Sequence, residues 1–346
     1  MIRFSRSHQE SFCLSLLLIE YPPKPTHRLK KDNTAMSITY SVAASIVRLL
    51  NIKKLFRKSE TEILSFATKQ IKKFKLPLGQ FKGYHYSIEE IDGFKCLRLQ
   101  AALKPTTKAV LQLYGGGYVT PPDARDFKLA KRIVDQTGSD VWFFLYPLIV
   151  DQTLDVTFEK TNRLYQHMLE QYDPEQISIL GFSSGACLAI GLGQYNNEQP
   201  RRLPSPRQII AVSPGGIPLS LCDEHQVVSG EDADFIASLR ALSAQDIIID
   251  YHYFDTVASI LNRTKRLPDY MINSCVGDFS HFPKTYLYYG SHECLYACAP
   301  YYERAFVQYG VPYEIRVGEG LCHCYPLFRF FPEGRKAQDE IINLLR

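Results

Sequence analysis

Short apolar segments alternate with amphipathic segments along most of this chain, beginning near residue 84. The short segments are rich in β-branched and aromatic residues, which favours strands, and the segments between them repeat apolar residues at helical spacing. The candidate strands are 94–101, 108–113, 140–146, 177–181, 207–213, 284–289 and 312–317. The candidate helices are 124–137, 154–171, 184–195, 297–309 and 334–345. This alternation predicts an α/β fold with a mostly parallel central sheet and helices on both faces.

Two regions depart from the alternation. Residues 216–283 separate two strand–helix units by a long stretch of mixed helical character, which is too long for a simple loop and predicts a helical cap. Residues 37–75 also repeat apolar residues at three- and four-residue spacing. We therefore expect N-terminal cap helices in 36–83 and an α/β domain in 84–346, with a cap insertion at about 216–283.

The first 35 residues precede the helical and strand patterns and are interpreted separately. Arg3 and Arg6 precede an apolar run at 12–19, as in a weak signal peptide, but no cleavage site of small residues follows. We expect residues 1–35 to be a disordered extension, or an artefact upstream of a true start at Met36. No apolar stretch reaches 18 residues, so no membrane-spanning helix is expected.

Charge is unevenly distributed along the chain. Residues 1–75 contain 15 Lys and Arg against 5 Asp and Glu, a balance of +10, so the rest of the chain carries −6 of the net +4. A basic segment with an apolar helical pattern at 37–58 is consistent with weak contact to a membrane surface, or simply with a solvated helix face. Stacking aromatic residues are not interleaved with the basic ones, so nucleic acid is not an expected partner.

The nine cysteines are odd in number and irregular in spacing. A chain of 346 residues buries a large core without disulfides, so reduced thiols and a cytoplasmic location are expected. Cys294 with Cys298, and Cys322 with Cys324 around His323, offer zinc-ligand types. Thiols on either side of a histidine point to opposite sides of an extended segment, which disfavours joint coordination. No metal and no other cofactor is predicted.

The sequence Gly181-Phe182-Ser183-Ser184-Gly185 lies directly between a candidate strand and a candidate helix. A G-x-S-x-G sequence in this context indicates a nucleophile elbow, a turn so tight that glycines are needed on both sides of the serine. The serine then lies at the carboxyl edge of the sheet, beside the positive end of the helix dipole. The alternative is an ordinary turn between a strand and a helix.

Three consecutive glycines, Gly115–Gly117, follow the candidate strand 108–113. Without side chains, their backbone N–H groups can approach a ligand closely and stabilise a developing oxyanion. The alternative is a flexible glycine turn. The elbow 68 residues downstream favours the oxyanion role.

A serine nucleophile needs a base, and the base needs an orienting acid. Glu293 follows the strand 284–289 and His323 follows the strand 312–317, so both fall at the carboxyl edge where such sheets carry their sites. Along the chain, the serine comes first, then the acid, then the histidine, which is the order expected when the nucleophile lies in such an elbow. Asp278 is the alternative acid, although it precedes its strand, and His281 and His292 are the nearest other histidines.

Together these motifs resemble the hormone-sensitive-lipase-like branch of the α/β hydrolases, over about residues 84–346. The resemblance implies an α/β-hydrolase catalytic domain under a helical cap formed by 37–75 and 216–283. It also implies a triad of Ser183, Glu293 and His323 and an oxyanion hole formed by the N–H groups of Gly116, Gly117 and Ser184. The chain departs from the branch in four places: Tyr114 replaces a histidine, Phe182 replaces an aspartate, Tyr146–Asp151 differs from the usual Tyr-Arg-Leu-Ala-Pro-Glu, and the usual Asp-Pro-Met-Leu element of the cap is not recognisable.

The resulting prediction is a carboxylic-ester hydrolase that acts on small or medium acyl esters through an acyl-enzyme. Two alternatives remain from the sequence: a non-catalytic ligand-binding protein on the same fold, and a serine peptidase or amidase. The sequence leaves a homodimer open.

Overall fold

The computed structural model describes residues 28–32, 36–101, 106–221, 230–261 and 267–346. Its centre is one nine-stranded sheet with the order β1-β9-β8-β7-β6-β4-β5-β3-β2. The strands are β1 Arg28–Asp32, β2 His85–Ile91, β3 Phe94–Gln100, β4 Ala109–Leu113, β5 Asp140–Phe144, β6 Ile177–Phe182, β7 Gln208–Val212, β8 Lys284–Gly290 and β9 Tyr313–Gly318. The expectation of a mostly parallel sheet is confirmed, because only β3 and β2, at one end, run antiparallel to their neighbours.

Burial explains which strands the sequence revealed. Every residue of β4, β5, β6 and β7 is buried, as both faces of these strands are covered, and each had been visible as an apolar run. The edge strand β2 was not predicted. Its residues alternate between exposed and half-buried positions and include Glu89 and Glu90, so it lacks the apolar signal of a central strand.

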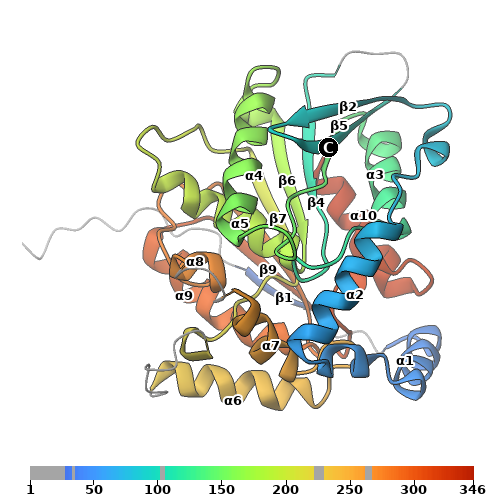
Figure 1. Cartoon of the computed structure of the whole chain (residues 1–346), viewed down its shortest axis with the longest axis vertical. Coiled ribbons are helices and arrows are strands. Elements are labelled where there is room, and N and C mark those ends of the chain that lie inside the picture. The colour runs from blue at the N-terminus through green and yellow to red at the C-terminus, as the bar shows by residue number, and fades with distance from the viewer. Residues whose placement is uncertain (1–27, 33–35, 102–105, 222–229, 262–266) are drawn as a thin grey trace, which may run out of the picture.

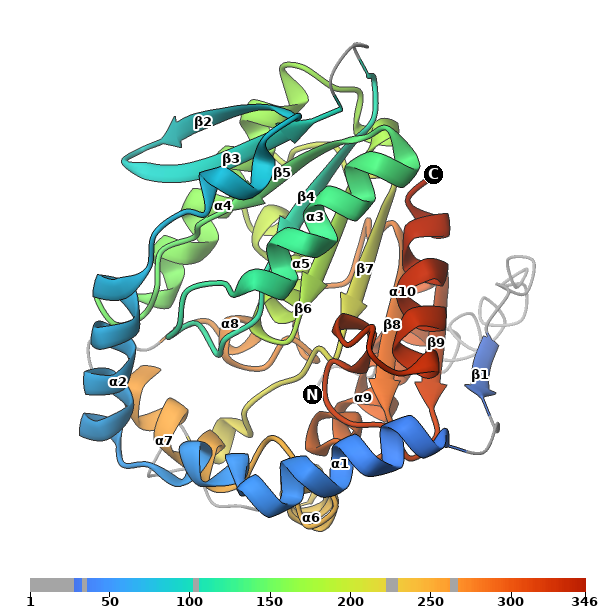
Figure 2. The same cartoon turned by 90° about the vertical axis from the view of Figure 1, so that its right-hand side faces the viewer.

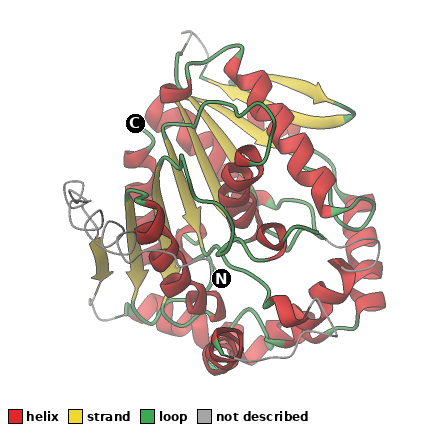
Figure 3. Ribbon diagram, turned by 90° about the vertical axis from the view of Figure 1, so that its left-hand side faces the viewer, coloured by secondary structure: helices red, strands yellow, loops and turns green. Residues whose placement is uncertain are grey.

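Helices cover both faces of the sheet (Figures 1 and 3). Helices α4 and α5 pack together on one face, where α5 contacts β6 and β7, and α3 contacts β5 and packs with α10. The helices are α1 Ile38–Leu50, α2 Glu60–Lys73, α3 Ala124–Thr137, α4 Leu154–Leu169, α5 Ser184–Asn197, α6 Glu231–Ser243, α7 His252–Leu261, α8 Asp269–Ile272, α9 Ala299–Tyr309 and α10 Pro332–Leu344.

Helices α1, α2, α6 and α7 lie at the end of the molecule toward which the parallel strands point (Figure 2). We call these four the cap helices. The first two come from the N-terminal region and the last two from the stretch 216–283, and they meet where α7 contacts α2 and the 3₁₀ helix Ile52–Arg57. The carboxyl edge of the sheet is therefore enclosed by segments that are far apart in sequence.

The helical pattern at 37–75 is interrupted in the structure. Helix α1 ends at Leu50 and is capped by Asn51, whose left-handed backbone (φ 48°) suits a residue that closes a helix. Helix α2 begins after Ser59, whose side chain accepts from the backbone of Glu62 while the Glu62 carboxylate accepts from the backbone of Ser59. This reciprocal capping starts a new helix in a new direction.

Part of the extension expected to be disordered forms an edge strand. Strand β1 pairs in parallel with β9, and Lys30 Nζ lies 2.7 Å from a carboxylate oxygen of Glu314 on β9. Pairing with an open sheet edge accounts for its order. The remaining residues of the 1–35 extension, including the apolar run at 12–19, lie outside the described residues. Within the described part of the chain, no helix is both long and apolar enough to cross a membrane.

Candidate active site

Ser183 occupies the turn between β6 and α5. Its backbone has φ 51° and ψ −121°, a region that side-chain-bearing residues rarely adopt, so the turn is strained. A Cβ added at Gly185 would lie 2.3 Å from the carbonyl oxygens of Leu113 and Tyr114, and one added at Gly181 would lie 2.2 Å from the carbonyl oxygen of Gly185. The predicted elbow is thus held by backbone contacts that only glycine allows.

The structure brings Ser183, His323 and Glu293 together from three different strand ends. His323 Nε2 lies 3.0 Å from Ser183 Oγ, and His323 Nδ1 lies 2.8 Å from Glu293 Oε2. Glu293 is fully buried and His323 nearly so, whereas Ser183 is partly exposed. The hydroxyl is therefore the accessible end of a hydrogen-bonded chain whose acidic end is shielded from water.

Burial and charge shift the pKa values of the buried pair. Burial raises the pKa of Glu293, and the hydrogen bond from His323 opposes that rise. Burial would lower the pKa of His323, but the neighbouring Cys324 and Glu293 outweigh burial and raise it well above its usual value. The carboxylate therefore favours the protonated form of the imidazole.

Two residues that the sequence analysis did not single out hold the loops that carry Glu293 and His323. The buried carboxylate of Asp246, in the loop after α6, accepts from the backbone N–H of Cys294 at 2.9 Å, one residue after Glu293. Ser213, at the end of β7, accepts from the N–H of Cys324 at 3.0 Å, one residue after His323. Both contacts join segments that are more than 40 residues apart, and no local pattern marks them.

Gly116 and Gly117 follow β4 and Ser184 follows the elbow serine after β6, and β4 and β6 are neighbouring strands. Gly115 packs directly on the elbow, because a Cβ added there would lie 3.2 Å from Ser183 Cβ. Ser184 is the first residue of α5, where helix N–H groups lack partners within the helix. None of the three N–H groups donates to another group among the described residues. They are free to bind an anion, assisted by the dipole of α5.

Tyr114 and Phe182, the two single residues that depart from the resembled branch, belong to the core. Tyr114 is buried and stacks on Tyr146, with ring centroids 4.3 Å apart, and on Phe143 at 5.8 Å. The Tyr146 hydroxyl donates to the Tyr114 carbonyl oxygen at 2.7 Å. Phe182 is also fully buried. The glycine loop is therefore anchored from below by an aromatic stack.

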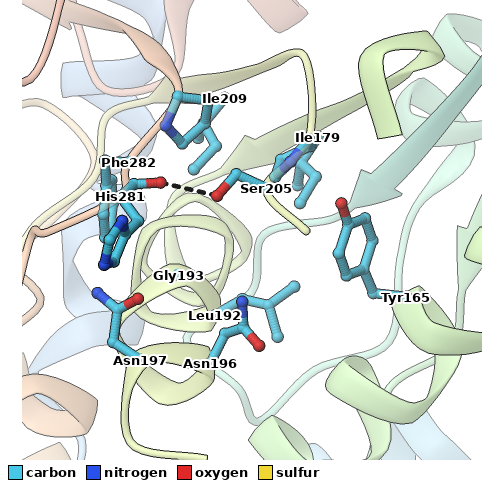
Figure 4. Close-up of a pocket in the computed structure, with 12 residues that line it drawn as sticks. Tyr165, Ile179, Leu192, Gly193, Asn196, Asn197, Ser205, Ile209, His281 and Phe282 are labelled. Carbon is cyan, nitrogen blue, oxygen red and sulfur yellow. Dashed lines mark hydrogen bonds between the residues drawn. The ribbon is translucent and has the colours of Figure 1, made fainter. Parts of the chain in front are cut away.

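The alternative acid and histidines lie elsewhere. The Asp278 carboxylate accepts from the backbone and hydroxyl of Ser280. His281 lines a small cavity beneath α5, where its carbonyl accepts from the Ser205 hydroxyl (Figure 4). This cavity encloses about 20 Å³, room for one water molecule, so it suits no organic substrate. His292 donates its backbone N–H to Leu321 and supports the loop of the acid.

The cysteines near the site form no metal centre in the described part of the chain, where no group of three or more His, Cys, Asp or Glu side chains has suitable geometry. Cys294 and Cys298 are buried, and burial raises the pKa of both thiols. Cys324 Sγ lies 3.5 Å from His323 Nε2, the same nitrogen that faces Ser183.

Comparison with known families identifies the fold that carries this geometry. The model of the α/β hydrolase fold family matches residues 110–327, which span the glycine loop, the elbow and the loops of the acid and the base. The chain belongs to the α/β-hydrolase fold family. This α/β hydrolase therefore carries its predicted site residues at the positions where its fold exposes side chains, at the carboxyl ends of the strands.

Named relatives of this α/β hydrolase include esterases and lipases. It is 26% identical to the esterase LipU of Mycobacterium tuberculosis over 244 residues, covering 70% of this chain and 78% of that protein. It is 25% identical to an esterase of Acinetobacter venetianus, covering 68% of this chain and 73% of the relative. An esterase structure from the bacterial hormone-sensitive lipase family superposes with a TM-score of 0.70 at 19% identity, covering 90% and 99% of the two chains. A putative esterase from Staphylococcus aureus gives 0.68 at 19%, covering 83% and 92%.

Proposed function

We propose that this α/β hydrolase is a carboxylic-ester hydrolase with Ser183 as nucleophile, His323 as base and Glu293 as orienting acid. The observation that carries the proposal is the continuous chain from Ser183 Oγ to His323 at 3.0 Å and from His323 to Glu293 at 2.8 Å. The esterase names of its relatives support an ester rather than another acyl substrate. The expected substrates are esters of small or medium acyl groups.

The geometry supports a two-step reaction. Ser183 Oγ bonds to the ester carbonyl carbon while its proton moves to His323 Nε2, and the carbonyl oxygen becomes an oxyanion. The N–H groups of Gly116, Gly117 and Ser184 hold that oxyanion. The alcohol leaves with the proton from His323, giving an acyl-enzyme on Ser183. Water then attacks the acyl carbon and gives its proton to His323, which passes it to Ser183 Oγ as the bond to the acyl carbon breaks and the acid leaves.

Replacement of the nucleophile tests the proposal. We expect Ser183→Ala to lower kcat for p-nitrophenyl butyrate by roughly 10⁶-fold, because the reaction loses its covalent route. The melting temperature should change little. The control Ser45→Ala alters an exposed serine on α1 and should keep full activity. Undiminished turnover by Ser183→Ala would reject Ser183 as the nucleophile.

The same reagents separate the two alternatives. A fluorophosphonate probe should label Ser183, whereas a non-catalytic ligand-binding protein on this fold would not react. Esters should be hydrolysed much faster than matched p-nitroanilide amides. The reverse preference would favour a peptidase or amidase.

The proposal includes a role for the cap. Residues 36–83 and 216–283 would together cover the active site, with Asp246 linking the cap to the loop of Glu293. A cytoplasmic location is part of the proposal, in keeping with the free thiols of the seven described cysteines.

A weak contact between residues 37–58 and an anionic lipid surface is also part of the proposal. Ile38, Val42, Ile46 and Leu49 form one exposed apolar stripe along α1 and line a shallow groove there. The hydroxyls of Ser41 and Ser45 in this groove donate to backbone carbonyls one turn earlier, which lowers the cost of covering them. The exposed Arg48 and Lys54 complement anionic head groups.

A further inference from the structure

Tyr253, on the first turn of the cap helix α7, reaches the glycine loop. A Cβ added at Gly117 would lie 1.8 Å from the Tyr253 hydroxyl oxygen and 2.9 Å from its ring carbon Cζ. Because a C–C bond is about 1.5 Å long, the hydroxyl oxygen lies within about 3.3 Å of Gly117 Cα. The phenol therefore touches the backbone that supplies the oxyanion-hole N–H groups.

The ring is held firmly in that position by other parts of the cap. It makes an edge-to-face contact with Phe56, with centroids 5.1 Å apart. The backbone N–H of Tyr253 donates to the Asp250 carbonyl at 3.0 Å. The Asp250 carboxylate lies 2.7 Å from Arg57 Nε, so α7 begins at a point fixed to the N-terminal cap segment. Donors that are fixed before reaction are the ones that stabilise a transition state most.

The hydroxyl is chemically free to donate. No hydrogen bond engages it among the described residues. Burial raises the pKa of Tyr253 well above its usual value, so the phenol keeps its proton at any pH at which His323 acts as a base. A neutral hydroxyl therefore lies against Gly117, the residue that would supply one of the oxyanion-hole N–H groups.

We propose that Tyr253 is a further catalytic residue, which donates a fourth hydrogen bond to the oxyanion formed when Ser183 attacks the ester. The inference rests on the proposed ester hydrolysis. The phenol proton stays on Tyr253 throughout: the Ser183 oxygen bonds to the carbonyl carbon, the carbonyl π electrons move to its oxygen, and the hydroxyl proton of the serine goes to His323. Since the donor belongs to the cap, the oxyanion hole is complete only with the cap in place.

The substitution Tyr253→Phe isolates the hydroxyl because it keeps the ring and its contact with Phe56. We expect kcat for p-nitrophenyl butyrate to fall roughly 10- to 100-fold with KM nearly unchanged, since oxyanion donors act in the transition state. A trifluoromethyl ketone, which forms an oxyanionic adduct with the serine, should bind more weakly by a similar factor. The control Tyr251→Phe should behave as the wild type, because the Tyr251 ring packs on Arg240 instead.

Melting temperatures of the variants show whether the fold persists. Wild-type kcat and ketone affinity in Tyr253→Phe would overturn the inference. A rise in KM alone would also overturn it, by making Tyr253 a wall of the substrate pocket. An active wild type with an unaffected Tyr253→Phe rejects only this inference, whereas a wild type without esterase activity rejects the proposed function and this inference with it.

Discussion

Glu293 and His323 form a buried acid–base pair in which each partner changes the proton affinity of the other. His323 can act as the proposed base only when it is neutral, so its raised pKa should move the acid limb of the activity profile to higher pH. Activity should therefore rise with pH through a midpoint above the usual histidine value. The Glu293 carboxylate contributes to this shift because it stabilises the protonated imidazole.

Neutralising the acid tests this coupling. We expect Glu293→Gln to move the acid limb of kcat/KM to lower pH, since it removes a charge that raises the His323 pKa. It should also lower kcat by roughly 10⁴-fold, because an amide no longer fixes the reactive tautomer. A pH–rate series with p-nitrophenyl butyrate measures both effects. The exposed Glu319, which accepts from Ser291, provides the control Glu319→Gln. An unchanged limb would contradict the coupling.

The sequence pointed to Ser183, Glu293 and His323 because each follows a recognisable strand, and the topology of a parallel sheet brings strand ends together. Such reasoning does not reach three other residues near the site: Asp246, Ser213 and Tyr253. Asp246 and Tyr253 belong to the cap, whose position depends on packing between distant segments. Ser213 follows a predicted strand, but a lone serine there has no spacing that would distinguish it from a loop residue.

At the scale of elements, the β6–α5 turn is the most constrained connection in the site. Its apolar strand and following helix were visible in the sequence because both are buried. The missed strands β1 and β2 lie at the two edges of the sheet, where one side of the ladder is open and the apolar pattern is weak. The break in the helical pattern at Asn51 was missed for another reason, since the apolar spacing continues beyond it.

The tightness of this turn yields a stability prediction. Gly185→Ala should lower the free energy of unfolding by about 3 kcal/mol, because its Cβ meets two backbone carbonyl oxygens that cannot rotate away. The control Gly79→Ala introduces a Cβ with nothing within 4 Å and should change stability little. Urea unfolding followed by the fluorescence of Trp142 measures both. Equal stability of the two variants would show that the turn can relax.

On the surface of the molecule, the exposed apolar residues of α1 form a stripe, whereas its only tryptophan, Trp142, is buried in the sheet. Ile38 and Leu49, at the ends of the stripe, are more than 80% exposed. Helix α1 is nevertheless fixed to the body of the molecule, since both the backbone N–H and the hydroxyl of Ser37 donate to the Glu333 carboxylate on α10. A rigidly held apolar surface can insert into a lipid interface without an ordering cost.

The double variant Ile38→Ser/Leu49→Ser tests the lipid contact. We expect wild-type protein to cosediment with phosphatidylglycerol vesicles, more weakly in 0.5 M NaCl, and the variant to bind several-fold less, because apolar insertion and charge act together. The control Val307→Ser changes an exposed apolar residue on α9. Vesicle binding that is unaffected by the double variant would contradict the assignment. A dimer that only the double variant disperses would instead assign the stripe to a second copy of the chain.

The placement of His323 has a consequence for biosynthesis. His323 follows β9, late in the sheet's order of synthesis, and its loop packs against α10 through the 3₁₀ helix Tyr325–Leu327. A ribosome completes the serine turn and most of the sheet long before it adds the general base. In the proposed mechanism the growing polypeptide holds a shaped but chemically silent pocket, and hydrolytic power appears only once His323 has been added and its loop has packed against α10.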